Sequence, residues 1–156
     1  MAVEREFLDR VSIMWSHKNM RTNESDLHEY QRDEHRVHLL NFHYVWTPKR
    51  RKAVLVDTIA EECRTLIEQK CMDKGWKVLE LAIQPDHIHL FVRIFPDDCP
   101  ADVVKECKGI PSYHLRRNHP SLLKLPSLWT RSYFVATAGN VSSQTIQRYI
   151  EAQTGK

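Results

Sequence analysis

Two histidines stand two residues apart in the apolar stretch "QPDHIHLFVRIF" (84–95). Residues i and i+2 of a β-strand point to the same face, so His87 and His89 would lie side by side, ~7 Å apart along the strand. Neutral imidazoles often bind metals, and two of them can converge on one ion. Two hydrogen-bonded histidines would explain the same pattern, because buried polar rings need partners. The spacing by itself therefore does not establish a metal site.

The C-terminal sequence "YIEAQ" supplies two further groups with useful chemistry. Tyr149 and Gln153 are four residues apart, which places them on one face of a helix. A tyrosine hydroxyl can act as a nucleophile, and an amide oxygen can bind a hard metal ion. A metal held by two imidazoles and one amide would keep positions open for a phosphate group. Taken alone, Tyr149 is more simply explained as a packing residue on an amphipathic helix.

A strand and a helix are predicted before the histidine pair. Residues 36–47, "RVHLLNFHYVWT", alternate and are rich in β-branched and aromatic residues, which predicts a strand that ends at Pro48. Residues 56–74 carry apolar side chains at helical spacing, so we expect an amphipathic helix there. Asp57 is its expected cap, and Gly75 is expected to close it.

The histidine pair lies on the second of two predicted strands, 76–83 and 87–95, joined by a short Gln-Pro-Asp turn. A further helix is expected to start at Pro100. Pro111 falls within its register and is predicted to break or kink it.

The remainder of the chain predicts one more strand and one more helix. The segment 120–128 contains two prolines and reads as a loop, and 131–139 reads as a strand. A closing helix over 142–153 would carry Tyr149. The order predicts an α+β fold: a ferredoxin-like β-α-β-β-α-β antiparallel sheet with helices on one face, plus a C-terminal tyrosine-bearing helix. Residues 1–34 are polar and form a predicted N-terminal extension, so the domain would span 35–156.

Composition places the chain among soluble globular proteins, with 42% hydrophobic and 28% charged residues among 156. No apolar run approaches the ~20 residues of a membrane span, and the N-terminus lacks a secretion signal. The four cysteines have no C-x-x-C spacing, so we expect reduced, partly buried thiols and a cytoplasmic location.

Positive charge is concentrated in "PKRRK" (48–52) and "YHLRRNH" (113–119), although the net charge is only +3. Such clusters can track a nucleic-acid backbone, and a solvated face explains them equally well. The candidates for backbone contact are Lys49, Arg50, Arg51, Arg116 and Arg117.

Four stretches taken in order resemble one family. They are "FHYVWTPKRR", "QPDHIHLFV", "KGIPSYHLRR" and "LWTRSYFVATAGNVSSQTIQRYIEAQ". Over residues ~36–154 the chain resembles the single-tyrosine HUH transposases of the insertion-sequence 200/605 family. The His-x-His motif is weak by itself, but its combination with W-x-x-S-Y-F, G-N-V-S and Y-I-x-x-Q in that order is specific.

The resemblance implies a role for each site residue. His87, His89 and Gln153 would bind a divalent metal, Mg²⁺ or Mn²⁺, beside the scissile phosphate. Tyr149 would attack single-stranded DNA at a transposon end, giving a 5′-phosphotyrosine and a free 3′-OH that later attacks another junction. Excision and insertion would follow by strand transfer.

The resemblance also implies the partners. The family binds imperfect hairpins at transposon ends and acts as a homodimer, in which the tyrosine helix of one subunit can complete the histidine site of the other. Gly139-Asn140, just before the helix, would be the joint for such an exchange, although a simple helix-entry turn explains the same residues.

Two other functions remain open from the sequence. A replication-initiator or relaxase nickase shares the HUH chemistry, but such proteins are usually longer and often carry a three-histidine cluster. A non-catalytic RNA-binding module on a ferredoxin-like sheet would need stacking aromatics on the two central strands, for which Phe42 and Tyr44 are candidates.

Overall fold

The computed structural model describes residues 30–137. Its main part is a four-stranded antiparallel sheet with the strand order β4-β5-β3-β6. The strands are β3 (Leu40–Trp46), β4 (Lys77–Gln84), β5 (His87–Ile94) and β6 (Phe134–Thr137). Together with the helices α3 (Asp57–Lys74) and α4 (Pro100–Asn118), they give the chain order β-α-β-β-α-β. The predicted ferredoxin-like arrangement is confirmed.

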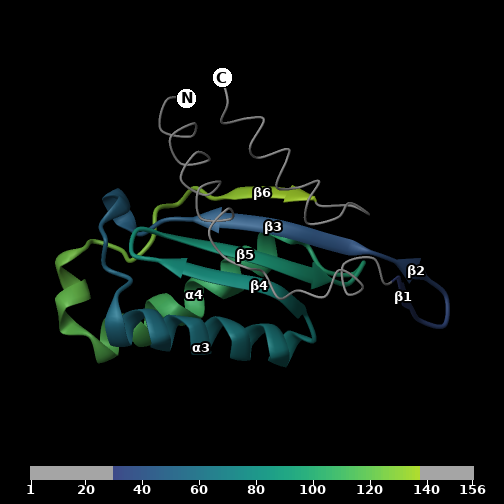
Figure 1. Ribbon diagram of the computed structural model, residues 1–156, viewed down its shortest axis with the longest axis horizontal. Helices are drawn as coiled ribbons and strands as arrows, with labels where there is room; N and C mark the ends of the chain where they lie inside the picture. The colour runs from purple at the N-terminus through teal and green to yellow at the C-terminus, as the bar shows by residue number, and fades with distance from the viewer. Residues whose placement is uncertain (1–29, 138–156) are drawn as a thin grey trace, which may run out of the picture. The chain divides into compact units, whose positions relative to one another are not determined.

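Both long helices cover the same face of the sheet, as Figure 1 shows, with β4 at one edge and β6 at the other. The core between helices and sheet contains Tyr44 and Trp46 of β3, together with Ile88, Leu90 and Val92 of β5. These residues alternate along their strands with the side chains of the other face. That parity assigns the remaining residues of β5, including both predicted site histidines, to the face opposite the helices.

Strand β3 pairs with β5 over its full length, from Leu40 opposite Ile94 to Trp46 opposite Ile88. Every residue of β5 is buried. Strand β6 is shorter than the predicted 131–139 and pairs with the other edge of β3. A sheet with buried central strands has a strongly specified register, because a shift by one residue would exchange the two faces.

Helix α3 begins and ends close to the predicted residues. Its end is confirmed at Gly75, which has a φ of 75° that a residue without a Cβ adopts without strain. The predicted cap is wrong, because Val56 occupies the N-cap position and Asp57 lies in the first turn. In the first turn, its carboxylate still interacts favourably with the positive end of the helix dipole.

Helix α4 runs through Pro111, so of the predicted break or kink at this proline the break is wrong. Pro111 is buried, and the turns on either side of it pack into the core through Cys107 and Leu115. The end of the helix is tied to α3, since His119 Nε2 lies 2.7 Å from Glu62 Oε2. Because proline has no N–H, the helix lacks one backbone hydrogen bond at Pro111, and the packing of the turns on both sides outweighs this loss.

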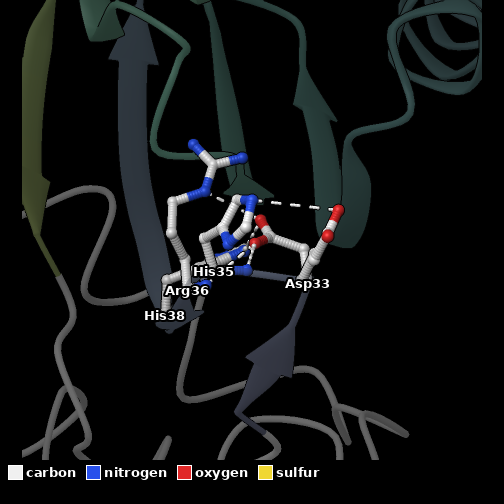
Figure 2. Close-up of polar contacts among 5 residues, drawn as sticks. Asp33, His35, Arg36 and His38 are labelled. Atoms are coloured by element: carbon white, nitrogen blue, oxygen red, sulfur yellow. Dashed lines mark hydrogen bonds and ion pairs between the residues drawn. The ribbon is translucent and has the colours of Figure 1, made fainter.

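Two short strands, β1 (Gln31–Arg32) and β2 (Val37–His38), form a separate two-stranded antiparallel hairpin. Asp33 organises its turn, as Figure 2 shows: the carboxylate accepts bonds from the backbone N–H of His35 and Arg36 and from Arg36 Nε. The N–H of His35 is the largest cause of the lowered pKa of Asp33. The first strand falls within the predicted extension 1–34.

The predicted helix over 142–153 lies outside the described residues. Within 30–137, neither helix is long and apolar enough to cross a membrane. The first part of the two-proline segment 120–128 forms the 3₁₀ helix η2 (Pro120–Lys124) rather than a simple loop, and Leu122 of this helix enters the core.

Adjacent leucines in η2 offer a test of the core. Leu122 is 1% exposed and Leu123 is 58% exposed. Leu122→Ala should lower the free energy of unfolding by about 2–5 kcal/mol, because it leaves a cavity. Leu123→Ala should change it by less than about 0.5 kcal/mol. Urea unfolding followed by circular dichroism measures both, and equal effects would contradict the packing described.

The cysteines offer a second test. Cys63, Cys71 and Cys107 are buried, Cys99 is exposed, and all four are free thiols. Burial raises the pKa of Cys63 to about 12, which suppresses its reactive thiolate at pH 8. Iodoacetamide should therefore alkylate Cys99 first in the native protein and the other three only in denaturant, as read by mass spectrometry. Native Cys63 reacting as fast as Cys99 would refute this arrangement.

Candidate active site

The two predicted site histidines lie on β5, on the sheet face opposite the helices. His87 pairs with Gln84 of β4, and His89 lies between Ala82 of β4 and Val45 of β3. Their exposed fractions are 4% and 0%. The polar rings therefore occupy interior positions on a central strand, where each needs a hydrogen-bond partner.

The partner of His89 is a third histidine. His43 of β3 lies diagonally across the strand pair, and its Nε2 is 2.8 Å from His89 Nδ1. The two ring centroids are 4.0 Å apart. Burial lowers the pKa of His43 to about 4, and burial is also the largest cause of the strongly lowered pKa of His89. Both rings are therefore neutral at pH 7, the form in which imidazole binds metals.

The partner of His87 is the residue before it. Asp86 ends the turn between β4 and β5, and its Oδ1 is 2.8 Å from His87 Nδ1. The other carboxylate oxygen, Oδ2, lies 3.3 Å from Nη2 of Arg51. Each predicted ligand thus has its Nδ1 engaged within the protein, so metal binding by either ring would use Nε2.

The other predicted site residues are not brought into this geometry. Tyr149 and Gln153 lie outside the described residues. Among residues 30–137, no group of three or more histidine, cysteine or acidic side chains is arranged to hold a metal ion. His43 is a third histidine beside this pair. Its Nε2 is hydrogen-bonded to the ring of His89, so it is a partner of that ring rather than a further metal ligand.

The basic candidates divide into two groups. Arg51 and Arg116 have contacts within the protein: Arg51 pairs with Asp86, and Arg116 donates to the carbonyl of Leu125. Of the others, Lys49 is half-buried like those two, Arg50 is exposed, and exposed Arg117 donates to the hydroxyl of Tyr113. Contact of any of the five with DNA stays a prediction.

Sequence reasoning did not single out His43 or Asp86. Asp86 had a readable signal, because a carboxylate next to a candidate metal ligand is a common orienting partner. His43 could be recognised only with the strand register, which places it on the same face as His89 across the β3–β5 pair. Of the two stacking candidates of an RNA-binding module, Tyr44 is buried in the core on the helix side and Phe42 packs against that core.

Comparison with known proteins identifies the family. The model of the family described as "Transposase IS200 like" matches residues 36–153. The chain belongs to the IS200-like transposase family. The ISDra2 transposase TnpA of Deinococcus radiodurans is 30% identical over 123 residues, covering 77% of this chain and 88% of the relative. The transposase of the insertion sequence IS200 from Salmonella typhimurium is 27% identical over 115 residues, covering 72% and 75%.

Solved structures agree with this assignment. A transposase from Deinococcus radiodurans superposes with a TM-score of 0.66 at 32% identity, over 81% of this chain and 99% of the other. A REP-associated tyrosine transposase, solved bound to a REP hairpin, superposes with a TM-score of 0.53 at 15% identity, over 77% and 69%. At 15% identity, the likeness to the REP-associated transposase shows a shared fold only. The chain is thus a transposase, a DNA-processing enzyme.

Two neighbouring arginines of this transposase test the structural contacts of α4. The guanidinium of Arg116 bonds a backbone carbonyl at 3.1 Å, so Arg116→Ala should cost about 1.5–3 kcal/mol of unfolding free energy. Arg117 bonds the exposed Tyr113, and Arg117→Ala should change stability by less than about 0.5 kcal/mol. Thermal and urea unfolding measure the difference. A larger loss in Arg117→Ala would contradict these contacts.

Proposed function

We propose that this chain is a metal-dependent transposase that cuts and rejoins single-stranded DNA through Tyr149. The observation that carries the proposal is the pair of buried histidines on β5 in a chain of a transposase family. Both rings have their Nδ1 atoms bonded to side chains of the same protein. Metal-binding histidines commonly have their other ring nitrogen held by a neighbouring group, so this arrangement favours a pair of metal ligands over two isolated core histidines.

The covalent step belongs to Tyr149. Its phenolic oxygen forms a bond to the scissile phosphorus, the bond from phosphorus to the 3′ oxygen breaks, and the phenol proton is lost as the leaving 3′-OH gains one. The 5′-phosphotyrosine keeps the bond energy, so that a later 3′-OH can attack it and release the tyrosine without hydrolysis. A phenol has a pKa of about 10, so its proton must be drawn away by the site.

His87, His89 and Gln153 are the proposed ligands of a divalent cation, Mg²⁺ or Mn²⁺. The donor set fits: two imidazoles, of which burial keeps His89 uncharged at neutral pH, and one amide oxygen suited to a hard ion. When bound, the cation would neutralise charge on the phosphate oxygens and orient the phosphate for in-line attack. Because β5 is buried, its two histidines would hold the cation away from bulk water.

The proposed substrate is a DNA hairpin at a transposon end, bound by a homodimer whose two active sites are shared between subunits. A structurally similar tyrosine transposase was solved with a hairpin, which supports this class of substrate. Lys49, Arg50 and Arg117 are the proposed contacts to the DNA backbone, with Arg51 and Arg116 adding charge beside them.

The test is formation of a covalent protein–DNA adduct. Labelled single-stranded DNA carrying candidate transposon ends is incubated with the full-length protein, with and without Mg²⁺, and SDS-resistant adducts are resolved on a gel. Tyr149→Phe should abolish the adduct, and Tyr30→Phe, which changes an exposed tyrosine ahead of β1, should leave it unchanged. His87→Ala should slow cleavage at least about 100-fold, since metal stabilisation of the phosphate is worth several kcal/mol, while hairpin binding persists.

An adduct of equal yield in Tyr149→Phe would refute the proposed nucleophile. Cleavage that is independent of Mg²⁺ and unaffected by His87→Ala would refute the proposed metal role.

A further inference from the structure

We propose that Asp86 and His43 are positioning residues that hold the two metal-binding imidazoles in one tautomer, with Arg51 holding Asp86 in turn. The inference rests on the proposed metal role of His87 and His89 and adds the groups that make these rings competent. It assigns a positioning role to three side chains outside the His-x-His pair itself.

The first contact fixes the proton on His87. An ionised carboxylate can only accept hydrogen bonds, so a separation of 2.8 Å between Asp86 Oδ1 and His87 Nδ1 requires the proton on Nδ1. A neutral ring has one N–H, so Nε2 then carries the lone pair. Nε2 is therefore the nitrogen with which His87 binds a metal.

Asp86 is itself held from the rest of the chain. Its second oxygen pairs with Arg51, which lies in the 3₁₀ turn η1 (Lys49–Arg51) thirty-five residues earlier. Both side chains are mostly buried, at 22% and 20% exposed, so the pair is less screened than a surface salt bridge. The preceding residue, Pro85, accepts a backbone bond from Leu55. The turn that carries the carboxylate is thus anchored at two points.

The second contact fixes His89 through another ring. A hydrogen bond between His43 Nε2 and His89 Nδ1 requires one nitrogen to donate and the other to accept. If His43 donates, the proton of His89 sits on Nε2 and blocks a metal there. If His89 donates, its Nε2 lone pair is ready. Metal binding therefore selects the arrangement in which His43 accepts.

The gain comes from preorganisation. A histidine without a fixed Nδ1 partner rotates and exchanges between two tautomers, and only one of them presents the lone pair in the required direction. Partners of this kind change metal affinity by about 10–100-fold in other metal sites. Here the two rings receive different partners, a carboxylate for His87 and a neutral imidazole for His89.

The first experiment measures Mn²⁺ affinity of the full-length protein by calorimetry, without DNA. Asp86→Ala should weaken binding about 10–100-fold, and Asp86→Asn, which keeps an oxygen acceptor, should recover part of the loss. Arg51→Ala should weaken binding less than Asp86→Ala does. Arg50→Ala is the matched control: it removes the same charge at a similar backbone φ, 58° against 51°, and should leave Mn²⁺ affinity unchanged.

The second experiment separates positioning from packing at His43. His43→Phe keeps an aromatic ring but removes the acceptor, and His43→Gln restores an acceptor close to the position of Nε2. The first should weaken Mn²⁺ binding about 10–100-fold, and the second should recover part of it. Circular dichroism confirms that both variants are folded.

A spectroscopic measurement covers the case in which the His43 variants fail to fold. Long-range ¹H–¹⁵N NMR of ¹⁵N-histidine-labelled wild type reports which ring nitrogen carries the proton. With Mg²⁺ present, His87 and His89 should both be protonated at Nδ1. A proton on Nε2 of either ring, or equal Mn²⁺ affinity in wild type, Asp86→Ala and His43→Phe, overturns the assignment.

These outcomes are distinct from failure of the proposed function. A wild type that binds no Mn²⁺ overturns both the metal role and the positioning role. A wild type that binds Mn²⁺ but forms no DNA adduct overturns the transposition chemistry alone, because neither experiment here uses DNA or Tyr149.

Discussion

Strand β5 is buried along its whole length, and this constraint shapes the rest of the site. One face of the strand supplies Ile88, Leu90 and Val92 to the core beneath the helices. The other face must place two imidazoles in an interior position, where every polar atom needs a partner. The register of β5 against β3 and β4 therefore decides both the packing of the fold and the surroundings of the histidines.

The partners come from parts of the chain that are distant in sequence. His43 is supplied by the neighbouring strand, forty-six residues before His89. Asp86 is supplied by the turn that starts β5, and Arg51 by the 3₁₀ segment that follows β3. Since these contacts bridge β3, its following turn and the β4–β5 hairpin, the fold and the proposed metal site depend on the same sheet. A change in strand register would disrupt both together.

Much of the fold could be predicted from the sequence, because local residue patterns determine its strands and helices. Alternation located the strands, and helical spacing with Gly75 located α3. The break predicted at Pro111 is absent because local helix propensity does not include the packing around Cys107 and Leu115, which keeps α4 continuous. The roles of His43 and Asp86 depend on which side chains meet, and that requires the strand pairing. Tyr149 and Gln153 remain predictions, since they lie outside the described residues.

The central proposal, which rests on the family assignment and the geometry of β5, is that His87 and His89 form one half of a metal site in this transposase. A crystal of the protein grown with Mn²⁺ tests it most directly, through the anomalous scattering of the ion. The account predicts an anomalous peak bonded to Nε2 of both histidines, with Nδ1 of His87 still on Asp86 and Nδ1 of His89 still on His43. A map with no peak at these rings, or with the ion on an Nδ1 atom, would contradict it.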